Sequence, residues 1–154
     1  MDAVSEFEDD DLINDDLPLG DVVLGLREKE RLFVRLLGLV GGIVTKSDLQ
    51  KPPVRMWLFG MITLIEMRFT AMIEHFMPDE SWLQFLSEGR LEKARAILAE
   101  RERRNQHLKL LDCLQFSDRG QILARNEKVR ELTRFNSRRK FEDMVKKLEQ
   151  LRNN

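Results

Sequence analysis

The chain of 154 residues is long enough for one ordinary domain or two small ones, with 42% hydrophobic and 34% charged residues. This composition, with a mean hydropathy of -0.40, is typical of a soluble globular protein and argues against a collagen-like or wholly disordered chain. The acidic start lacks the basic and apolar runs of a secretory signal peptide. The single cysteine, Cys113, cannot form an internal disulfide, so a reducing, cytoplasmic location is expected.

The formal net charge of -1 conceals two regions of opposite sign. Residues 1–21 hold nine acidic residues and no basic ones, whereas residues 90–154 hold eighteen Lys or Arg and ten Asp or Glu, a net charge of +8. Within the basic region, the run Arg138, Arg139 and Lys140 is the candidate contact for nucleic acid, with RNA as the expected polyanion. Helices rich in Arg, Lys and Glu are often simply solvated, so both interpretations stay open.

The first third of the chain predicts a small α/β unit. Residues 1–11 lack a sustained apolar period and are expected to form a flexible acidic leader. Residues 12–13 are expected to form a short strand, and apolar residues at spacings of three and four predict a helix that begins at Pro18. The β-rich runs 32–34 and 42–45, joined through glycines, predict an antiparallel hairpin.

The sequence from Gly42 to Asp48 follows the pattern glycine, two apolar residues, Ser or Thr, two variable residues and Asp. With the preceding helix and strands, it resembles the CBS motif, the β-α-β-β-α module of Bateman-type regulatory domains, and places a partial CBS-like unit at residues 12–50. The resemblance implies AMP, ADP or ATP as ligand, with Thr45 at the phosphate and Asp48 at the ribose hydroxyls. Such motifs work in pairs, so a second subunit or a longer protein would supply the partner.

The same residues also allow a purely structural interpretation. A Thr followed three residues later by Asp is a helix-capping pattern, with Thr45 or Ser47 as the first capping residue. Many CBS units bind no ligand and serve as packing partners, so ligand binding and capping both remain open for Thr45 and Asp48.

Residues 51–154 predict an all-α bundle. Residues 54–76 contain many apolar residues and are long enough for a central buried helix. This helix is not expected to cross a membrane, because charged residues leave a charge-free run of about ten residues, well below the ~20 that a bilayer requires. Further helical segments are expected at residues 82–86, 91–104, 108–116, 118–123 and 137–154, with Gly89 ending the first and Ser117 with Asp118 capping the fourth. The predicted fold class is α+β, predominantly α.

The chain ends in Leu151-Arg152-Asn153-Asn154, and this ending and residues 110–118 are similar to the HEPN and abortive-infection helical families. In the nuclease members, an Arg followed by a polar residue lies a few positions before a His, and a dimer forms one RNA-cleaving site. The resemblance makes Arg152 the candidate catalytic residue, with its His expected beyond this chain, so the chain as it stands is not expected to be an enzyme.

No Cys/His cluster with metal spacing, Gly-rich phosphate loop or Ser/His/Asp arrangement occurs in the sequence, so neither a metal site nor a required cofactor is expected. His75 is interpreted as a residue at the core or its edge, and Cys113 as a buried hydrophobic residue.

Three functions remain open. The first is a regulatory or sensing protein, in which a CBS-like unit binds an adenine nucleotide and is coupled to a helical dimerisation or effector bundle. The second is a HEPN-like RNA-binding or RNA-cleaving protein of defence or stress. The third is a structural interaction module, in which the helix at 54–76 pairs with another subunit. A homodimer is expected, and a membrane partner is not.

Overall fold

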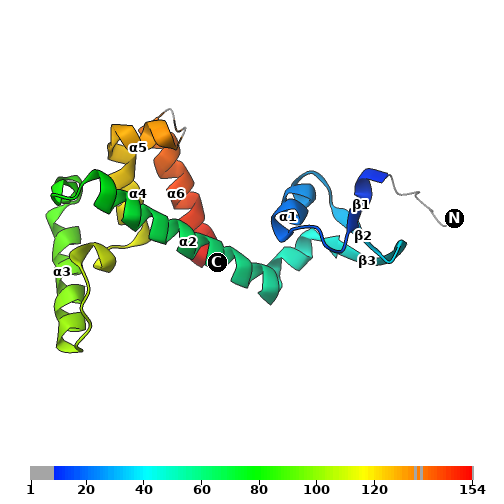
Figure 1. Ribbon diagram of the computed structural model, residues 1–154, viewed down its shortest axis with the longest axis horizontal. Helices are drawn as coiled ribbons and strands as arrows, with labels where there is room; N and C mark the ends of the chain where they lie inside the picture. The colour runs from blue at the N-terminus through cyan, green and yellow to red at the C-terminus, as the bar shows by residue number, and fades with distance from the viewer. Residues whose placement is uncertain (1–8, 134, 136, 154) are drawn as a thin grey trace. The chain divides into compact units, whose positions relative to one another are not determined.

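The computed structural model describes residues 9–133, 135 and 137–153 (Figure 1). The described chain contains six α-helices and one three-stranded sheet, so the predicted α+β, predominantly α fold class is confirmed. Backbone contacts divide the chain into two units, residues 1–58 and residues 59–154, and the division falls within α2 (Pro52–Phe76). The sequence analysis had placed this boundary after residue 50.

Unit 1 has the predicted order of strand, helix and hairpin. Its elements are β1 (Leu12–Asn14), α1 (Leu19–Glu28), β2 (Arg31–Leu36) and β3 (Leu39–Thr45). The sheet order is β1-β2-β3: β1 runs parallel to β2, with Leu12 opposite Phe33, and β2 runs antiparallel to β3, with Leu32 opposite Val44. The predicted helix, short first strand and hairpin are therefore confirmed.

Residues 1–8 of the predicted leader lie outside the described residues. Asp9–Asp11, which the same prediction included, instead form a short 3-10 turn that precedes β1. The carboxylate of Asp11 lies 2.7 Å from the ammonium of Lys29, and both side chains are about 30% exposed. This ion pair connects the end of α1 to the start of the sheet and holds the turn at Asp9–Asp11 in place.

A small apolar core joins α1 to the sheet. Val22 and Leu26 recur at a spacing of four on one face of α1, and both are buried with Leu32 of β2. The hairpin turn between β2 and β3 has Leu37 at φ 49° and Gly38 at φ 84°. Both are in the left-handed region, which suits Gly38 but is unusual for a leucine.

The long helix α2 corrects the prediction of a central buried helix. A narrow stripe of Val54, Ile62, Phe69 and Ile73 is buried, but several large apolar side chains of α2 are exposed. A helix is covered only on the side where neighbours pack: in unit 2, Ile62, Phe69 and Ile73 are core residues, and Ile65, Met72 and Phe76 are partly buried beside them.

By length and mean hydropathy alone, α2 is the one helix among the described residues that could span a bilayer. Its most apolar window has a mean hydropathy of 1.4, and 17% of that window is buried. Core helices of soluble proteins meet the same criteria, so the expected absence of a membrane partner stays a prediction.

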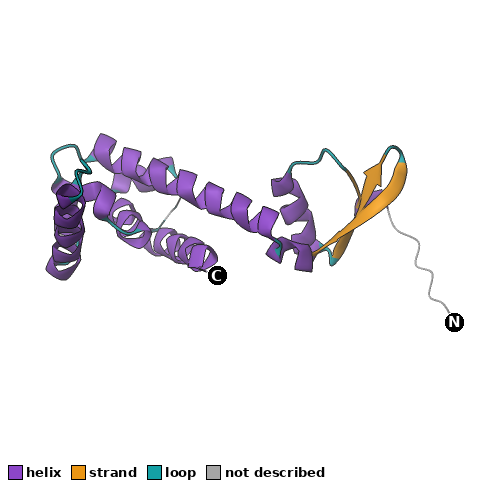
Figure 2. Cartoon of the chain, turned by 90° about the horizontal axis from the view of Figure 1, so that it is seen from below, coloured by secondary structure: helices purple, strands orange, loops and turns teal. Residues whose placement is uncertain are grey.

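Helices and 3-10 turns are the regular secondary structure of unit 2 among its described residues, and Figure 2 shows the helices joined by loops. After α2 come 3-10 turns at Ser81–Phe85 and Leu110–Cys113 and the helices α3 (Glu88–Arg103), α4 (Phe116–Arg125), α5 (Glu127–Leu132) and α6 (Arg138–Asn153). The final helix is confirmed. The short helix predicted at 82–86 is present as a 3-10 helix, Ser81–Phe85. The helix predicted at 108–116 is wrong, because only Leu110–Cys113 forms a 3-10 turn there and Phe116 already begins α4. Gly89 lies in the first turn of α3 instead of ending a helix.

The core of unit 2 depends on a close approach of α4 and α6. A methyl group added at Gly120 of α4 would lie 2.5 Å from Cγ1 of Val145 on α6, so only glycine fits there. Beside this contact, the ring of Phe69 stacks on Phe116 with 5.4 Å between centroids and lies 5.9 Å from the ring of Phe141. These aromatic contacts join α2, α4 and α6.

Candidate functional site

The predicted ligand-binding residues Thr45 and Asp48 lie together where β3 ends and a 3-10 turn, Lys46–Gln50, begins. The carboxylate oxygen Oδ2 of Asp48 accepts hydrogen bonds from the backbone N–H of Thr45 at 2.7 Å and from its hydroxyl at 2.8 Å. The hydroxyls of Thr45 and Ser47 are 2.7 Å apart. The structure thus brings the two predicted residues together, and Thr45 is the capping residue that the structural interpretation required.

A cation completes this cluster. The ammonium of Lys51 lies 2.5 Å from Oδ1 of Asp48, and the Lys51 side chain is 68% exposed. The hydrogen bond from Lys51, followed by those from the Thr45 backbone and hydroxyl, lowers the pKa of Asp48 from 3.8 to about 2. Asp48 is therefore a carboxylate at neutral pH, with its Oδ2 bonded to Thr45 and its Oδ1 paired with the Lys51 ammonium, whose side chain is largely exposed.

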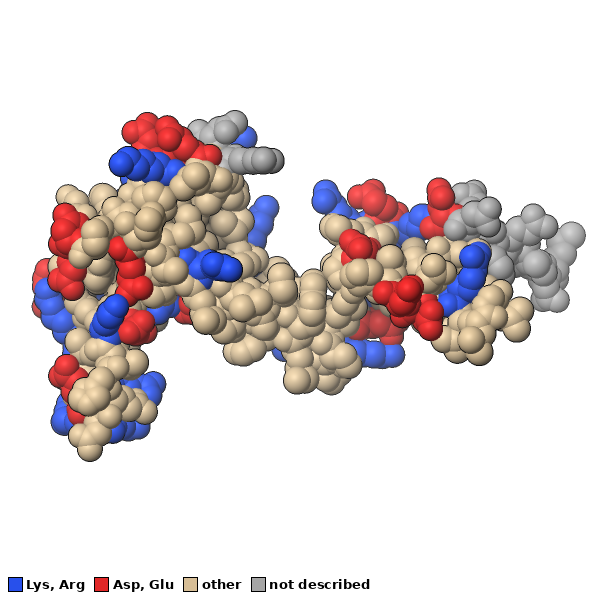
Figure 3. Space-filling view, viewed as in Figure 1, with Lys and Arg blue, Asp and Glu red and all other residues tan. Residues whose placement is uncertain are grey.

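The predicted nucleic-acid contact lies at the start of α6. Arg138, Arg139 and Lys140 are all exposed, and the guanidinium of Arg138 is paired with Glu142 at 2.7 Å. On the face drawn in Figure 3, basic and acidic side chains alternate over unit 2. The net positive charge of the bundle is thus distributed among ion pairs, with Arg139 and Lys140 exposed beside them.

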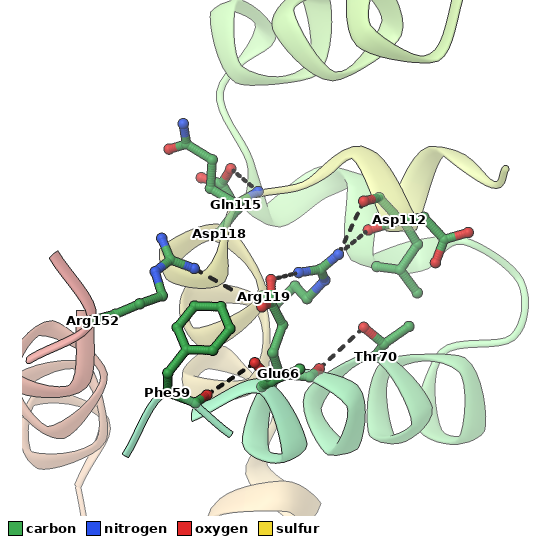
Figure 4. Close-up of polar contacts among 10 residues, drawn as sticks. Phe59, Glu66, Thr70, Asp112, Gln115, Asp118, Arg119 and Arg152 are labelled. Carbon is green, nitrogen blue, oxygen red and sulfur yellow. Dashed lines mark hydrogen bonds and ion pairs between the residues drawn. The ribbon is translucent and has the colours of Figure 1, made fainter. Parts of the chain in front are cut away.

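The candidate catalytic residue Arg152 lies on α6, beside a charged cluster that the sequence analysis did not predict (Figure 4). Its Nη1 is 3.9 Å from Oε2 of Glu66, and its guanidinium lies 5.8 Å from the centre of the Phe116 ring. The Arg152 side chain is 28% exposed, so part of it reaches solvent. Asn154, from the same predicted motif, lies outside the described residues.

Arg119 of α4 is the buried member of this cluster, with a side chain that is 6% exposed. Its Nη1 donates to Oε1 of Glu66, and its Nη2 donates to the backbone carbonyls of Leu111 at 3.2 Å and Asp112 at 3.1 Å. One guanidinium therefore connects α2, α4 and the turn at Leu110–Cys113. Its Nε is buried without a hydrogen-bond partner in the described structure.

Glu66 thus holds two arginines from two different helices through its two carboxylate oxygens. This arrangement neutralises a buried positive charge and positions a second, partly exposed one beside an aromatic ring. The sequence offered one signal for it: Glu66 is a lone acid within a long apolar run, where a charged side chain ordinarily needs a partner. The identity of that partner could not be read, because Arg119 is 53 residues away in the sequence.

Two other sequence interpretations concern single residues. Cys113 is 7% exposed, as predicted for a buried hydrophobic residue, and burial together with the nearby Asp112 charge raises the pKa of its thiol. His75 is exposed at the end of α2, and its ring packs edge-on against Phe76 with centroids 4.8 Å apart.

Among the described residues, no group of three or more His, Cys, Asp or Glu side chains is arranged to hold a metal ion. Comparison of the chain with protein-family models, curated proteins and solved structures found no match.

Proposed function

We propose that the chain is a regulatory or sensing protein, in which unit 1 binds an adenine nucleotide such as AMP, ADP or ATP and unit 2 serves as a dimerisation or effector bundle. The observation that carries the proposal is the cluster at the end of β3, where a hydroxyl and an ionised carboxylate lie 2.8 Å apart in a β-α-β-β unit. The strand order and the Gly42–Asp48 sequence support the resemblance to CBS motifs on which the choice of ligand rests.

The chemistry of the cluster suits a ribose and a phosphate. In the structure, Oδ1 of Asp48 contacts the exposed ammonium of Lys51. An exposed ion pair of this kind is weak, so a ligand can displace the ammonium from Asp48. In the proposed complex, a ribose hydroxyl donates to Oδ1, and the displaced Lys51 ammonium contacts the phosphate. The Ser47 hydroxyl joins it there, or the Thr45 hydroxyl does so by turning its proton from Asp48 to the phosphate. The two hydrogen bonds from Thr45 keep Asp48 in place before the nucleotide arrives.

Thermal melting with and without nucleotide tests this function. Ligand at ~100 times its dissociation constant stabilises the native state by ~2.7 kcal/mol, so a clear rise in the melting temperature is expected for at least one of AMP, ADP and ATP. Asp48→Ala should abolish the rise. Asp112→Ala is the matched control, because Asp112 accepts the same kind of hydrogen bond, 2.9 Å from the backbone N–H of Lys109, in unit 2.

The control variant should melt lower than the parent chain but keep the full nucleotide-dependent rise. No rise with any of the three nucleotides in the unsubstituted chain would reject nucleotide sensing. A rise that survives in Asp48→Ala would place the ligand elsewhere.

A second candidate function, RNA binding by the helical bundle, is favoured by the position of Arg152. The Arg152 side chain is partly exposed, and the exposed Arg139 and Lys140 lie on the same helix, α6. An arginine that reaches solvent is suited to a phosphate, and the buried Phe116 ring supports its guanidinium. This is the bundle that resembles the HEPN families, in which an Arg at the position of Arg152 contacts the RNA phosphate.

Salt-dependent RNA binding tests this candidate. Each phosphate contact to single-stranded RNA contributes ~0.7 to the slope of log affinity against log salt concentration. Replacing Arg139, Lys140 and Arg152 by Gln should therefore lower the slope by up to ~2. A charge-matched triple variant of the exposed Arg27, Arg31 and Arg35 of unit 1 is the control. An affinity that is independent of salt, or an equal loss in both variants, would reject RNA binding through α6.

A further inference from the structure

An exposed, uncharged face of α2 lies in unit 2, and it offers a surface for the dimerisation that the proposed function assigns to this unit. It consists of Phe59, Gly60, Thr63, Leu64 and Met67, whose spacing places them on one side of the helix. Phe59 is 60%, Leu64 56% and Met67 63% exposed, and no atom lies within 4 Å of a methyl group placed at Gly60. We call these five residues the α2 face. Figure 3 shows mainly uncharged surface along this part of α2.

The α2 face can be covered by an apolar neighbour without leaving a side-chain hydrogen-bond donor unpaired. The hydroxyl of Thr63, its polar side-chain group, already donates to the backbone carbonyl of Phe59 at 2.9 Å. Covering Thr63 therefore leaves no hydrogen-bond donor unsatisfied. Since the face has no charged residue, an apolar helix suits it better than a polyanion does.

We propose that the α2 face binds the α2 face of a second copy of this chain, as two antiparallel helices that cross at Thr63. The large side chains Phe59 and Met67 flank the small Gly60 and Thr63, so a two-fold axis at Thr63 places Phe59 of one copy against Met67 of the other. Aromatic rings and thioethers attract each other, and the small central residues let the helix backbones approach closely.

The area of the α2 face limits such a pair to a weak one. Each of its three large side chains, a little over half exposed, offers on the order of 100 Å², and the whole face offers roughly 400 Å² per copy. The resulting interface of roughly 800 Å² is smaller than the ~1,200–2,000 Å² of stable complexes. The dimer is therefore expected to dissociate on dilution, with a dissociation constant in the micromolar range, around 1 to 100 µM.

Disulfide crosslinking tests the position and direction of the pairing. In a Cys113→Ala background, Thr63→Cys lies on the two-fold axis and should form an intermolecular disulfide under mild oxidation. Ala71→Cys is the matched control: Ala71 is also exposed on α2, but it lies eight residues, ~12 Å, from Thr63. In an antiparallel pair, the two thiols of the Ala71→Cys variant are ~24 Å apart and should not crosslink.

Met67→Glu gives an independent measurement. A carboxylate placed against Phe59 of the other copy in a dry interface should raise the dimer dissociation constant at least ~30-fold in sedimentation experiments. Because Met67 is 63% exposed, the melting temperature of the dilute, monomeric variant should stay close to that of the parent chain.

Three results would overturn the proposal. The first is crosslinking of both cysteine variants, which indicates parallel helices. The second is a dimer that is unaffected by Met67→Glu and not crosslinked through residue 63. The third is a chain that stays monomeric at ~100 µM, the weak end of the expected range, and instead binds phosphatidylcholine vesicles. Neither measurement needs a nucleotide, so the pairing can fail while nucleotide sensing stands, and sensing can fail while the pairing stands.

Discussion

The protonation of Asp48 is controlled by its immediate neighbours. Hydrogen bonds from Lys51 and Thr45 lower its pKa from 3.8 to about 2. Because the folded-state pKa is below the unfolded value, the capping hydrogen bonds stabilise unit 1 fully above pH 3.8 and are lost as the pH falls through about 2.

An NMR titration of the Asp48 carboxyl carbon should therefore give a midpoint near 2, and the Thr45 amide proton should titrate with it. In Lys51→Met, which removes the largest cause of the shift, the midpoint should move upward toward 3.8. A midpoint at 3.8 in the unsubstituted chain would show that the carboxylate is not held by Thr45 and Lys51.

The pair of Glu66 and Arg119 is the other prediction at this scale. Glu66→Gln leaves the buried guanidinium without its charged partner, and we expect the free energy of unfolding to fall by ~1–3 kcal/mol. Glu142→Gln is the control, because it breaks an exposed pair with Arg138 and should cost ~1 kcal/mol or less. Urea denaturation of both variants measures the difference. Equal losses would mean that the buried pair contributes no more than a surface pair.

At the scale of elements, the contact of α4 with α6 depends on the absence of a side chain at Gly120. Gly120→Ala must displace Val145, and overpacking of this kind costs ~1–3 kcal/mol. Gly89→Ala, on the open first turn of α3, should instead be neutral or stabilise the chain by up to ~1 kcal/mol. The midpoints of urea denaturation decide this, and a stable Gly120→Ala variant would show that the helices can separate at no cost.

The elements of this fold differ in how far the sequence predicts them. The hairpin of unit 1 was predicted correctly because glycines separate its two β-rich runs. The helix at the chain's end was predicted correctly because its apolar periodicity is long and Ser137 precedes it. The helix predicted at 108–116 was wrong and the one at 82–86 is a 3-10 helix, since a short apolar run fits a 3-10 turn as well as an α-helix. For the site, local spacing placed Thr45 beside Asp48, whereas the Glu66–Arg119 pair depends on tertiary packing.

At the scale of the whole molecule, the two units have separate apolar cores, and each unit contains one tryptophan, Trp57 in unit 1 and Trp82 in unit 2. Leu26→Ala removes a fully buried side chain from unit 1 and should cost that unit ~2–5 kcal/mol. In single-tryptophan variants, the Trp57 fluorescence transition should then move to lower urea while the Trp82 transition stays in place. Leu123→Ala should do the reverse, and equal shifts of both transitions would show that the chain unfolds as one unit.

The rate at which a reagent labels the buried thiol of Cys113 measures local opening of unit 2. A thiol reagent can reach this sulfur only when the turn at Leu110–Cys113 opens, because the side chain is part of the core of unit 2. When reclosing is fast, the labelling rate reports the fraction of time that the turn is open, and at high reagent concentration it reports the opening rate itself. The guanidinium of Arg119 donates hydrogen bonds to two backbone carbonyls of this turn. Arg119→Lys should therefore increase the labelling rate of Cys113 by a larger factor than it increases the rate of global unfolding.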